Sequence, residues 1–271
     1  ALLIDIKFSG LASRIPSGFE KWLLDFAAIG TIADMVPLFG ENRILVRYGL
    51  YVMAKTKNLG LKTLMKEIGI KAEVKEFPDS EHLDSNITVY SVGFQIAPRI
   101  NAAGRIDHAN TAMELFLSST PEQAQKYATE LNRLNEERKV LTAQVFEEVD
   151  QRLESKGAII EKTKIIFEGD EHWPAGILGI VAARVAQKYY RPTFIYEIQK
   201  RSSVASARSI PGFNLYEAVE YVRPHLRAGG GHSGAAGMSF SNEEAGPIRT
   251  KLNEFGDKML TPEMLHPMLL I

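Results

Sequence analysis

The longest regular pattern of apolar and polar positions in the chain runs from Thr120 to about Glu154. Its apolar positions are 124, 127, 131, 134, 141 and 145, and they alternate in steps of three and four residues with Arg138 in one slot. This spacing predicts one amphipathic helix with a strongly charged outer face. Thr120 suits the N-cap, Pro121 suits the first helical position, and Gln123 completes a capping box. A helix of this length reaches about 50 Å. We expect it to link two lobes, and a coiled-coil dimer is the alternative.

Before this helix, the apolar pattern predicts a mainly helical lobe. Its landmarks are WLLDFAAIGTIADMVPL at 22–38, ENRILVRYGLYVM at 41–53 and the apolar segment 90–117. Residues 1–8, ALLIDIKF, have the pattern of a strand already under way, and the last residues form another apolar run. Both ends therefore suggest a piece of a longer protein.

After the helix, short β-rich runs at 164–169 and 192–198 flank a helical pattern at 175–190. In that helix, Ile180, Val181, Arg184, Val185 and Lys188 fit an apolar stripe with a basic edge. A strand, helix, strand unit favours a parallel or mixed sheet. Segments 202–210 and 235–240 supply further strands, and residues from 241 onward predict a closing amphipathic helix. The fold class is α/β, and the expected segments are 1–118, 119–156, 157–241 and 242–271.

Composition narrows the class of protein. The chain has 271 residues, of which 45% are hydrophobic and 24% charged, as in globular proteins with one or two cores. No cysteine is present, so any metal ion must use carboxylate, imidazole or water ligands. No apolar run approaches the roughly 18 residues that span a bilayer, and the first residues lack a secretory signal. We expect a cytoplasmic protein without membrane contact, while a net charge of -1 gives no global sign of nucleic-acid binding.

The first lobe contains two candidate sites. Asp34 is a single carboxylate in an apolar run, and such a residue is costly to bury unless it is paired or binds a cation. A capping or loop aspartate is the alternative. In PRINAAGR, we expect Arg99, Asn101 and Arg105 to surround a small-residue loop and to clamp a phosphate or carboxylate. Pairing with nearby acids would explain these arginines equally well.

In the second lobe, the glycine run RAGGGHSGAAGMSF at 227–240 needs a reason, because glycine carries a large entropic cost of ordering. It is either a tight connection into a strand or a backbone cradle for an anion. Between 184 and 208, six basic residues accompany one acid, and this density suits a polyanion or a solvated face. Donor groups that could form an anion pocket are Ser206, Arg208, the glycine loop 229–231 with Gly230 and Gly231, and His232. A structural histidine is the alternative for the last of these.

Taken in order, seven segments resemble RecJ-type single-strand-specific exonucleases of the DHH phosphoesterase superfamily. They are LLDFAAIGTIADMVPL, ENRILVRYGL, GFQIAPRINAAGR, WPAGILGIVAARV, RPTFI, SARSIPGFNLYEAVE and GGGHSGAAGMSF, and they cover residues 22 to 240. The resemblance implies that 1–118 is the C-terminal part of a DHH catalytic lobe. It further implies that 119–156 is a linker helix and that 157–241 is a smaller α/β DHH-associated domain with a mixed sheet. Residues 242–271 would then lead to a further domain.

The function implied by the resemblance is 5′-to-3′ hydrolysis of single-stranded DNA in repair and recombination, with two Mn²⁺ or Mg²⁺ ions. Asp34 matches the family's metal-ligand and catalytic aspartate. Arg99, Asn101 and Arg105 match a motif near the cleft between the lobes. Ser206, Arg208 and His232, with the adjoining glycines, match positions that hold nucleotide phosphates.

The sequence departs from the family, because it lacks the Asp-His-His triplet and the aspartate motifs before it. IDHAN at 106–110 has one histidine and stands in the wrong place. The oligonucleotide-binding barrel of many members is also absent. We therefore expect a RecJ-type core, truncated at both ends, that keeps substrate-binding surface but is inactive alone. Its partners would be single-stranded DNA and a single-strand-binding protein or helicase. The alternatives are a DHH phosphodiesterase for oligonucleotides or cyclic dinucleotides, and a non-catalytic binding relic.

Overall fold

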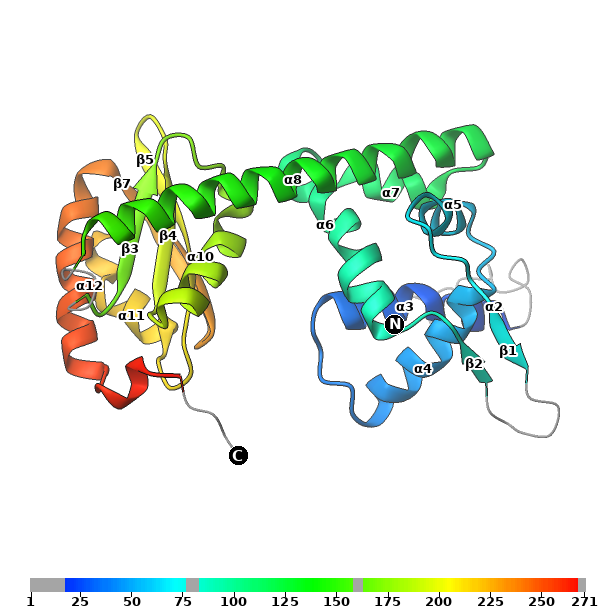
Figure 1. The fold of residues 1–271 in the computed structure, drawn as a ribbon, viewed down its shortest axis with the longest axis horizontal. Helices are drawn as coiled ribbons and strands as arrows, with labels where there is room; N and C mark the ends of the chain where they lie inside the picture. The colour runs from blue at the N-terminus through cyan, green and yellow to red at the C-terminus, as the bar shows by residue number, and fades with distance from the viewer. Residues whose placement is uncertain (1–17, 77–82, 158–162, 268–271) are drawn as a thin grey trace, which may run out of the picture. The chain divides into compact units, whose positions relative to one another are not determined.

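The computed structural model describes residues 18–76, 83–157 and 163–267. The chain divides into two compact units, Ala1–Glu137 and Arg138–Ile271, and the division falls within one long helix (Figure 1). The strand expected at residues 1–8 lies outside the described residues. The four segments expected from the sequence divide the chain differently and stay a prediction.

The long helix predicted from the apolar spacing is α8, Pro121–Ser155. Thr120 acts at its N-terminus as predicted, because its hydroxyl oxygen accepts a hydrogen bond from the Gln123 N–H at 3.3 Å. The capping box differs in one residue, since the Gln123 side chain accepts from the N–H of Ser119 at 3.3 Å. The local sequence thus sets where this helix begins.

The first unit is mainly helical, as predicted. Its elements are α2 (Phe19–Trp22), α3 (Leu24–Ala33), α4 (Gly40–Ala54), α5 (Leu59–Glu67), the antiparallel pair β1 (Val74–Glu76) and β2 (Leu83–Ser85), the π-helix η2 (Ser91–Ile96), α6 (Ala97–Ile106) and α7 (Asn110–Leu117). Its core gathers buried side chains from most of these helices and from the first half of α8, among them Ala28, Ile32, Met53, Leu61, Val92, Leu115 and Leu131.

The prediction of a loop at PRINAAGR is wrong, because these residues lie within helix α6. Pro98 stands where the π-helix η2 gives way to α6. Ala102 and Ala103 are completely buried in the core. Small residues here serve close helix packing and not a flexible turn.

The second unit is built on a mixed sheet, as predicted. Its strands are β3 (Ile166–Asp170), β4 (Thr193–Ile198), β5 (Ser202–Arg208), β6 (Ala228–Gly231) and β7 (Ala235–Ser241), in the order β3-β4-β5-β7-β6. β3 and β4 are parallel and are joined through α10 (Ala175–Tyr189), whereas the other pairs are antiparallel. A helix is the usual connection between neighbouring parallel strands.

Helices cover both faces of this sheet (Figure 1). On one face, α11 (Leu215–Tyr221) and α12 (Ala245–Met259) share a core with inward residues of the strands, such as Phe194, Ala205, Ala207 and Phe240. On the other face, α10 contacts β4 and β5. Short 3₁₀ turns complete the unit: η3 (Arg223–His225), η4 (Asn242–Glu244) and η5 (Glu263–Leu265).

Strand alternation explains which side chains point where. Along β5, Ala205 and Ala207 are buried in the core shared with α11 and α12. Ser206 and Arg208 alternate with them and so lie on the face that carries α10. Among the residues that the structure describes, no helix is both long and apolar enough to cross a membrane.

Candidate functional site

Two turns of the second unit are fastened together at one end of the sheet. One follows β5 at residues 209–214, and the other joins β6 to β7 at 232–234. The N–H of Ser209 donates to the carbonyl of Gly234 at 3.1 Å, and the N–H of Leu215 donates to that of Ser233 at 3.1 Å. A hollow of about 480 Å³ lies between the turns, lined by residues 209–214, Ser233 and Gly234. Two segments that stand apart in sequence thus form one local surface.

The glycine run is a strand and not the expected loop, because 228–231 is β6, which pairs with β7. The register aligns Gly230 with Gly237, and Gly237 with Ser206. A methyl group added at Gly230 would meet no atom within 4 Å, so the surface over this residue is open. At this row of residues, a ligand can approach the backbone closely.

Gly231 is needed for a different reason. Its φ of 149° is one that other residues rarely adopt, and an added Cβ would lie 2.3 Å from the carbonyl oxygen of Ala235. This glycine therefore permits the close turn that brings His232 to the end of β6.

His232 is exposed, and its Nδ1 accepts a hydrogen bond from the N–H of Gly234 at 3.2 Å. Its own N–H donates to the Ala235 carbonyl at 2.9 Å. Because Nδ1 is an acceptor, the neutral ring carries its proton on Nε2. The turn thus fixes the tautomer and presents Nε2–H as a donor.

Arg208 ends β5 opposite Ala235, at the same end of the sheet as His232. Its Nη1 donates to the carbonyl of Ala207 at 2.8 Å. Its guanidinium also lies against α10, because a Cβ added at Gly179 would be 2.9 Å from Nη2. Gly179 was not among the residues predicted from the sequence, although an isolated glycine inside a helical pattern is the signal that marks such close approaches.

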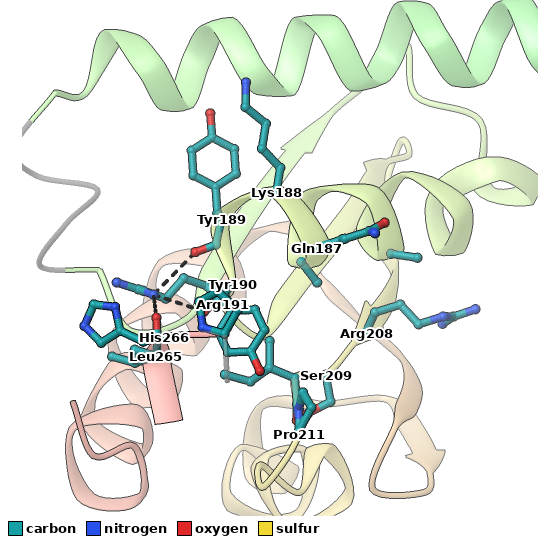
Figure 2. A pocket seen from close by; sticks show the side chains of 14 residues that line it. Gln187, Lys188, Tyr189, Tyr190, Arg191, Arg208, Ser209, Pro211, Leu265 and His266 are labelled. Carbon is teal, nitrogen blue, oxygen red and sulfur yellow. Dashed lines mark hydrogen bonds between the residues drawn. The ribbon is translucent and has the colours of Figure 1, made fainter. Parts of the chain in front are cut away.

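A second hollow, of about 680 Å³, is lined by the C-terminal part of α10, residues 208–211 and the segment 265–267 (Figure 2). Arg191 on its wall donates to the carbonyls of Thr163, Tyr189, Tyr190 and Leu265 at 3.0 to 3.3 Å. Burial lowers the pKa of Arg191. Arg208 extends away from this cluster, so the two arginines have different environments.

Only some of the basic residues between 184 and 208 are therefore candidates for binding a polyanion. Arg191 secures neighbouring backbone segments. Lys188 donates to Asp150 at 2.5 Å and to Glu154 at 3.2 Å, and the Asp150 hydrogen bond raises the pKa of Lys188. These two cations stabilise the second unit and contribute little to an external field.

In the first unit, Asp34 is the C-cap of α3 and is exposed, so the expected cost of burial does not arise. The helix ends in a Schellman motif, since the N–H of Val36 donates to the Thr31 carbonyl at 3.2 Å and that of Met35 donates to Ile32 at 3.1 Å. Met35 has a φ of 56°, a left-handed conformation that favours glycine. A carboxylate at a helix C-terminus meets the negative end of the helix dipole, which is unfavourable without a cation.

Helix α6 separates the three predicted clamp residues. The Arg99 Nε donates to Asn132 at 2.9 Å and its Nη1 donates to the Gln95 carbonyl at 2.7 Å, while burial lowers the pKa of Arg99. Asn101 and Arg105 are one turn apart on a common face, on another side of the helix from Arg99. Asn101 and Arg105 therefore lie together and Arg99 lies apart from them, and a clamp formed by all three stays a prediction.

The described parts of the chain contain no group of three or more histidines, aspartates and glutamates that could hold a metal ion. Asp34 can supply one oxygen ligand, whereas Mg²⁺ and Mn²⁺ prefer several around an octahedron. The residues described here do not assemble a centre for two ions.

Residues 161–256 match the family model of the DHHA1 domain. The chain is 39% identical over 259 residues to the single-stranded-DNA-specific exonuclease RecJ of Bacillus subtilis, covering 95% of this chain and 31% of that protein. It is 35% identical over 221 residues to RecJ of Thermus thermophilus, covering 82% of this chain and 29% of the relative. The chain thus spans about a third of the length of these relatives.

The structure of Thermus thermophilus RecJ in complex with Mn²⁺ superposes on this chain with a TM-score of 0.77 at 28% identity, over 93% of this chain and 35% of that one. A structure of exonuclease RecJ bound to manganese gives a TM-score of 0.73 at 28% identity, over 95% and 59% of the two chains. The mixed α/β architecture agrees with these structures. The chain is therefore homologous to a part of the RecJ exonucleases and contains a DHHA1 domain at residues 161–256.

Proposed function

We propose that this chain binds single-stranded DNA as part of an exonuclease that hydrolyses phosphodiester bonds from the 5′ end. The observation that carries this proposal is the junction of the two turns at the end of the sheet. Through the Ser209–Gly234 hydrogen bond, the end of β5 with Arg208 is held beside the glycine and histidine strand end. RecJ relatives named as single-stranded-DNA-specific exonucleases support the substrate.

Each residue of this junction has a role that its chemistry supports. Arg208 binds a phosphate through its planar guanidinium, which matches phosphate geometry. Ser206 and the His232 Nε2–H donate further hydrogen bonds. Gly230 and Gly231 let the DNA backbone lie close to the strand, because neither presents a side chain. These contacts recognise the backbone and carry no base sequence information.

Asp34 is proposed as a metal ligand of the catalytic centre. Two divalent ions supply an activated water and stabilise the charge that develops on the scissile phosphate. A single exposed carboxylate is too small a ligand set, so hydrolysis needs ligands beyond those that the described residues bring together. We therefore expect the 271-residue chain to bind DNA and not to hydrolyse it.

A labelled single strand incubated with this chain in Mn²⁺, Mg²⁺ or chelator tests the proposal. We expect salt-sensitive binding in all three conditions and intact strands throughout. Mn²⁺-dependent degradation that disappears in Asp34→Ala would contradict the expected inactivity. Absence of binding would contradict the DNA-binding role, and preferential turnover of a dinucleotide would favour a phosphodiesterase.

A further inference from the structure

Two aromatic rings stack on each other at the surface of the first unit. The Tyr90 and Phe94 rings have centroids 4.9 Å apart and an interplanar angle of 21°. Both side chains are exposed, to 63% for Tyr90 and 69% for Phe94. Stacked rings in this position bury little area from water, so they contribute less to folding than rings of this size in a core.

The helical segment that carries the two rings is anchored by its own buried side chains. Tyr90 precedes the π-helix η2, and Phe94 lies within it. Ser91, Val92 and Ile96 are buried beneath them. A π-helical turn is rare in proteins and occurs frequently at functional sites. The pair is therefore displayed by a well-anchored segment.

The segment that carries the pair packs against α3. Gly93, between the two aromatic residues, lies against α3, because a Cβ added there would be 3.5 Å from the Ile32 side chain. Ile32 is two residues from Asp34 at the end of the same helix. The segment that carries the rings therefore packs against the helix whose C-cap is Asp34.

The same helical run also carries polar groups suited to a phosphate. η2 continues directly into α6, whose Asn101 and Arg105 stand seven and eleven residues after Phe94. Both residues lie within α6, four positions apart and therefore on one side of that helix. Asn101 is exposed and Arg105 is half-exposed, whereas Ala102 and Ala103 are buried. The same helical run thus carries exposed aromatic faces and, further along, an amide and a cation.

We propose that Tyr90 and Phe94 form a stacking platform for a base of the single strand, with the adjoining phosphate bound by Asn101 and Arg105. This inference rests on the proposed DNA-binding function and extends it to the first unit. Every nucleobase has a π-face, so stacking on aromatic rings suits a strand of any sequence. A neighbouring cation complements the phosphates of the strand. An apolar protein or lipid partner would not need such a cation.

Fluorescence anisotropy of the 271-residue chain with a single strand and with an abasic strand of equal length separates base stacking from phosphate binding. For the unmodified chain, we expect the normal strand to bind about tenfold more tightly. In Tyr90→Leu/Phe94→Leu, this preference should disappear while binding of the abasic strand is kept. Tyr90→Phe should retain the preference, and Tyr48→Leu, at an exposed position of α4, is the matched control.

Three outcomes would overturn the inference. Equal binding of both strands by the unmodified chain, or a preference that survives in the double leucine variant, would refute the stacking platform and leave the proposed function intact. No binding of either strand would refute both. Circular dichroism of each variant shows whether the helices are retained, and a strand carrying 2-aminopurine should lose fluorescence on binding only when the rings are present.

Discussion

Gly179 in α10 and Arg208 at the end of β5 are in close contact, because a Cβ at residue 179 would lie 2.9 Å from a guanidinium nitrogen. In an exposed helix interior, glycine costs about 1 kcal/mol relative to alanine. Gly179 is buried, and its lack of a side chain leaves space for the Arg208 guanidinium. The helix accepts a weaker helix-forming residue where the proposed phosphate ligand needs room.

Gly179→Ala should therefore weaken binding of single-stranded DNA while α10 remains folded. We expect a loss of about tenfold, as for removal of a charge-assisted hydrogen bond worth roughly 1.5 kcal/mol. Anisotropy titration measures it. Gly246→Ala in α12, where an added Cβ meets nothing within 4 Å, is the matched control and should bind normally. Unchanged binding in Gly179→Ala would show that Arg208 does not depend on this space.

The two glycines at the end of β6 should respond differently to alanine. Gly231→Ala places a Cβ 2.3 Å from the Ala235 carbonyl at a φ of 149°, so we expect a loss of about 2 kcal/mol in unfolding free energy. Gly230→Ala has open space and should unfold at nearly the same urea concentration. If Gly230 lies under the DNA backbone, its alanine variant should nevertheless bind DNA more weakly. Equal stability of both variants would contradict the strand-end geometry.

Much of the fold is predictable from local pattern, because the spacing of apolar residues in α8 and the β-rich runs beside α10 are local signals. The helix at 97–106 is harder to predict. Its small residues resemble a loop in isolation, and packing of Ala102 and Ala103 in the core decides the outcome. The strand at 228–231 is equally hidden, since backbone pairing with β7 requires no side-chain preference.

The candidate site, like the fold, could be predicted only in part from local sequence. Ser206 and Arg208 lie on β5 and His232 follows β6, with β7 between these two strands, and their joint phosphate site stays a prediction. Arg99 could not be assigned from local sequence, because its partner Asn132 is 33 residues away. Local sequence reveals donor groups but not which of them the fold itself occupies.

Asp34→Asn should leave the stability of the first unit unchanged or slightly higher. Removing a negative charge from the C-terminal end of α3 relieves an unfavourable dipole interaction of about 0.3 to 1 kcal/mol. Urea unfolding of the variant and of the unmodified chain measures this difference. A destabilisation above roughly 1 kcal/mol would show that the carboxylate has a structural role, contrary to the metal-ligand proposal.

The buried carboxyl of Asp25 should make the first unit less stable as pH rises. Asp25 is 2% exposed, and burial raises its pKa despite a 2.6 Å hydrogen bond from the Thr56 hydroxyl. Since the folded pKa is above the unfolded value of 3.8, folding favours the protonated form. The stabilisation is complete below pH 3.8 and is lost as pH rises through the folded pKa.

Asp25→Asn removes this titration and keeps an oxygen acceptor for Thr56. Relative to the unmodified chain, the variant should gain stability as pH rises from 3.8 through the raised folded pKa. Thermal unfolding of both proteins across this range measures the difference. A stability difference independent of pH would contradict the raised pKa.

The most direct test of the account compares a 5′-phosphorylated single strand with its 5′-hydroxyl twin, bound without metal to the unmodified chain and to Arg208→Ala at two salt concentrations. The account predicts salt-sensitive binding that is tighter for the phosphorylated strand, and about tenfold weaker binding in the variant. Binding that is indifferent to Arg208 and to the terminal phosphate would contradict the assignment of the DHHA1 strand ends as the phosphate site.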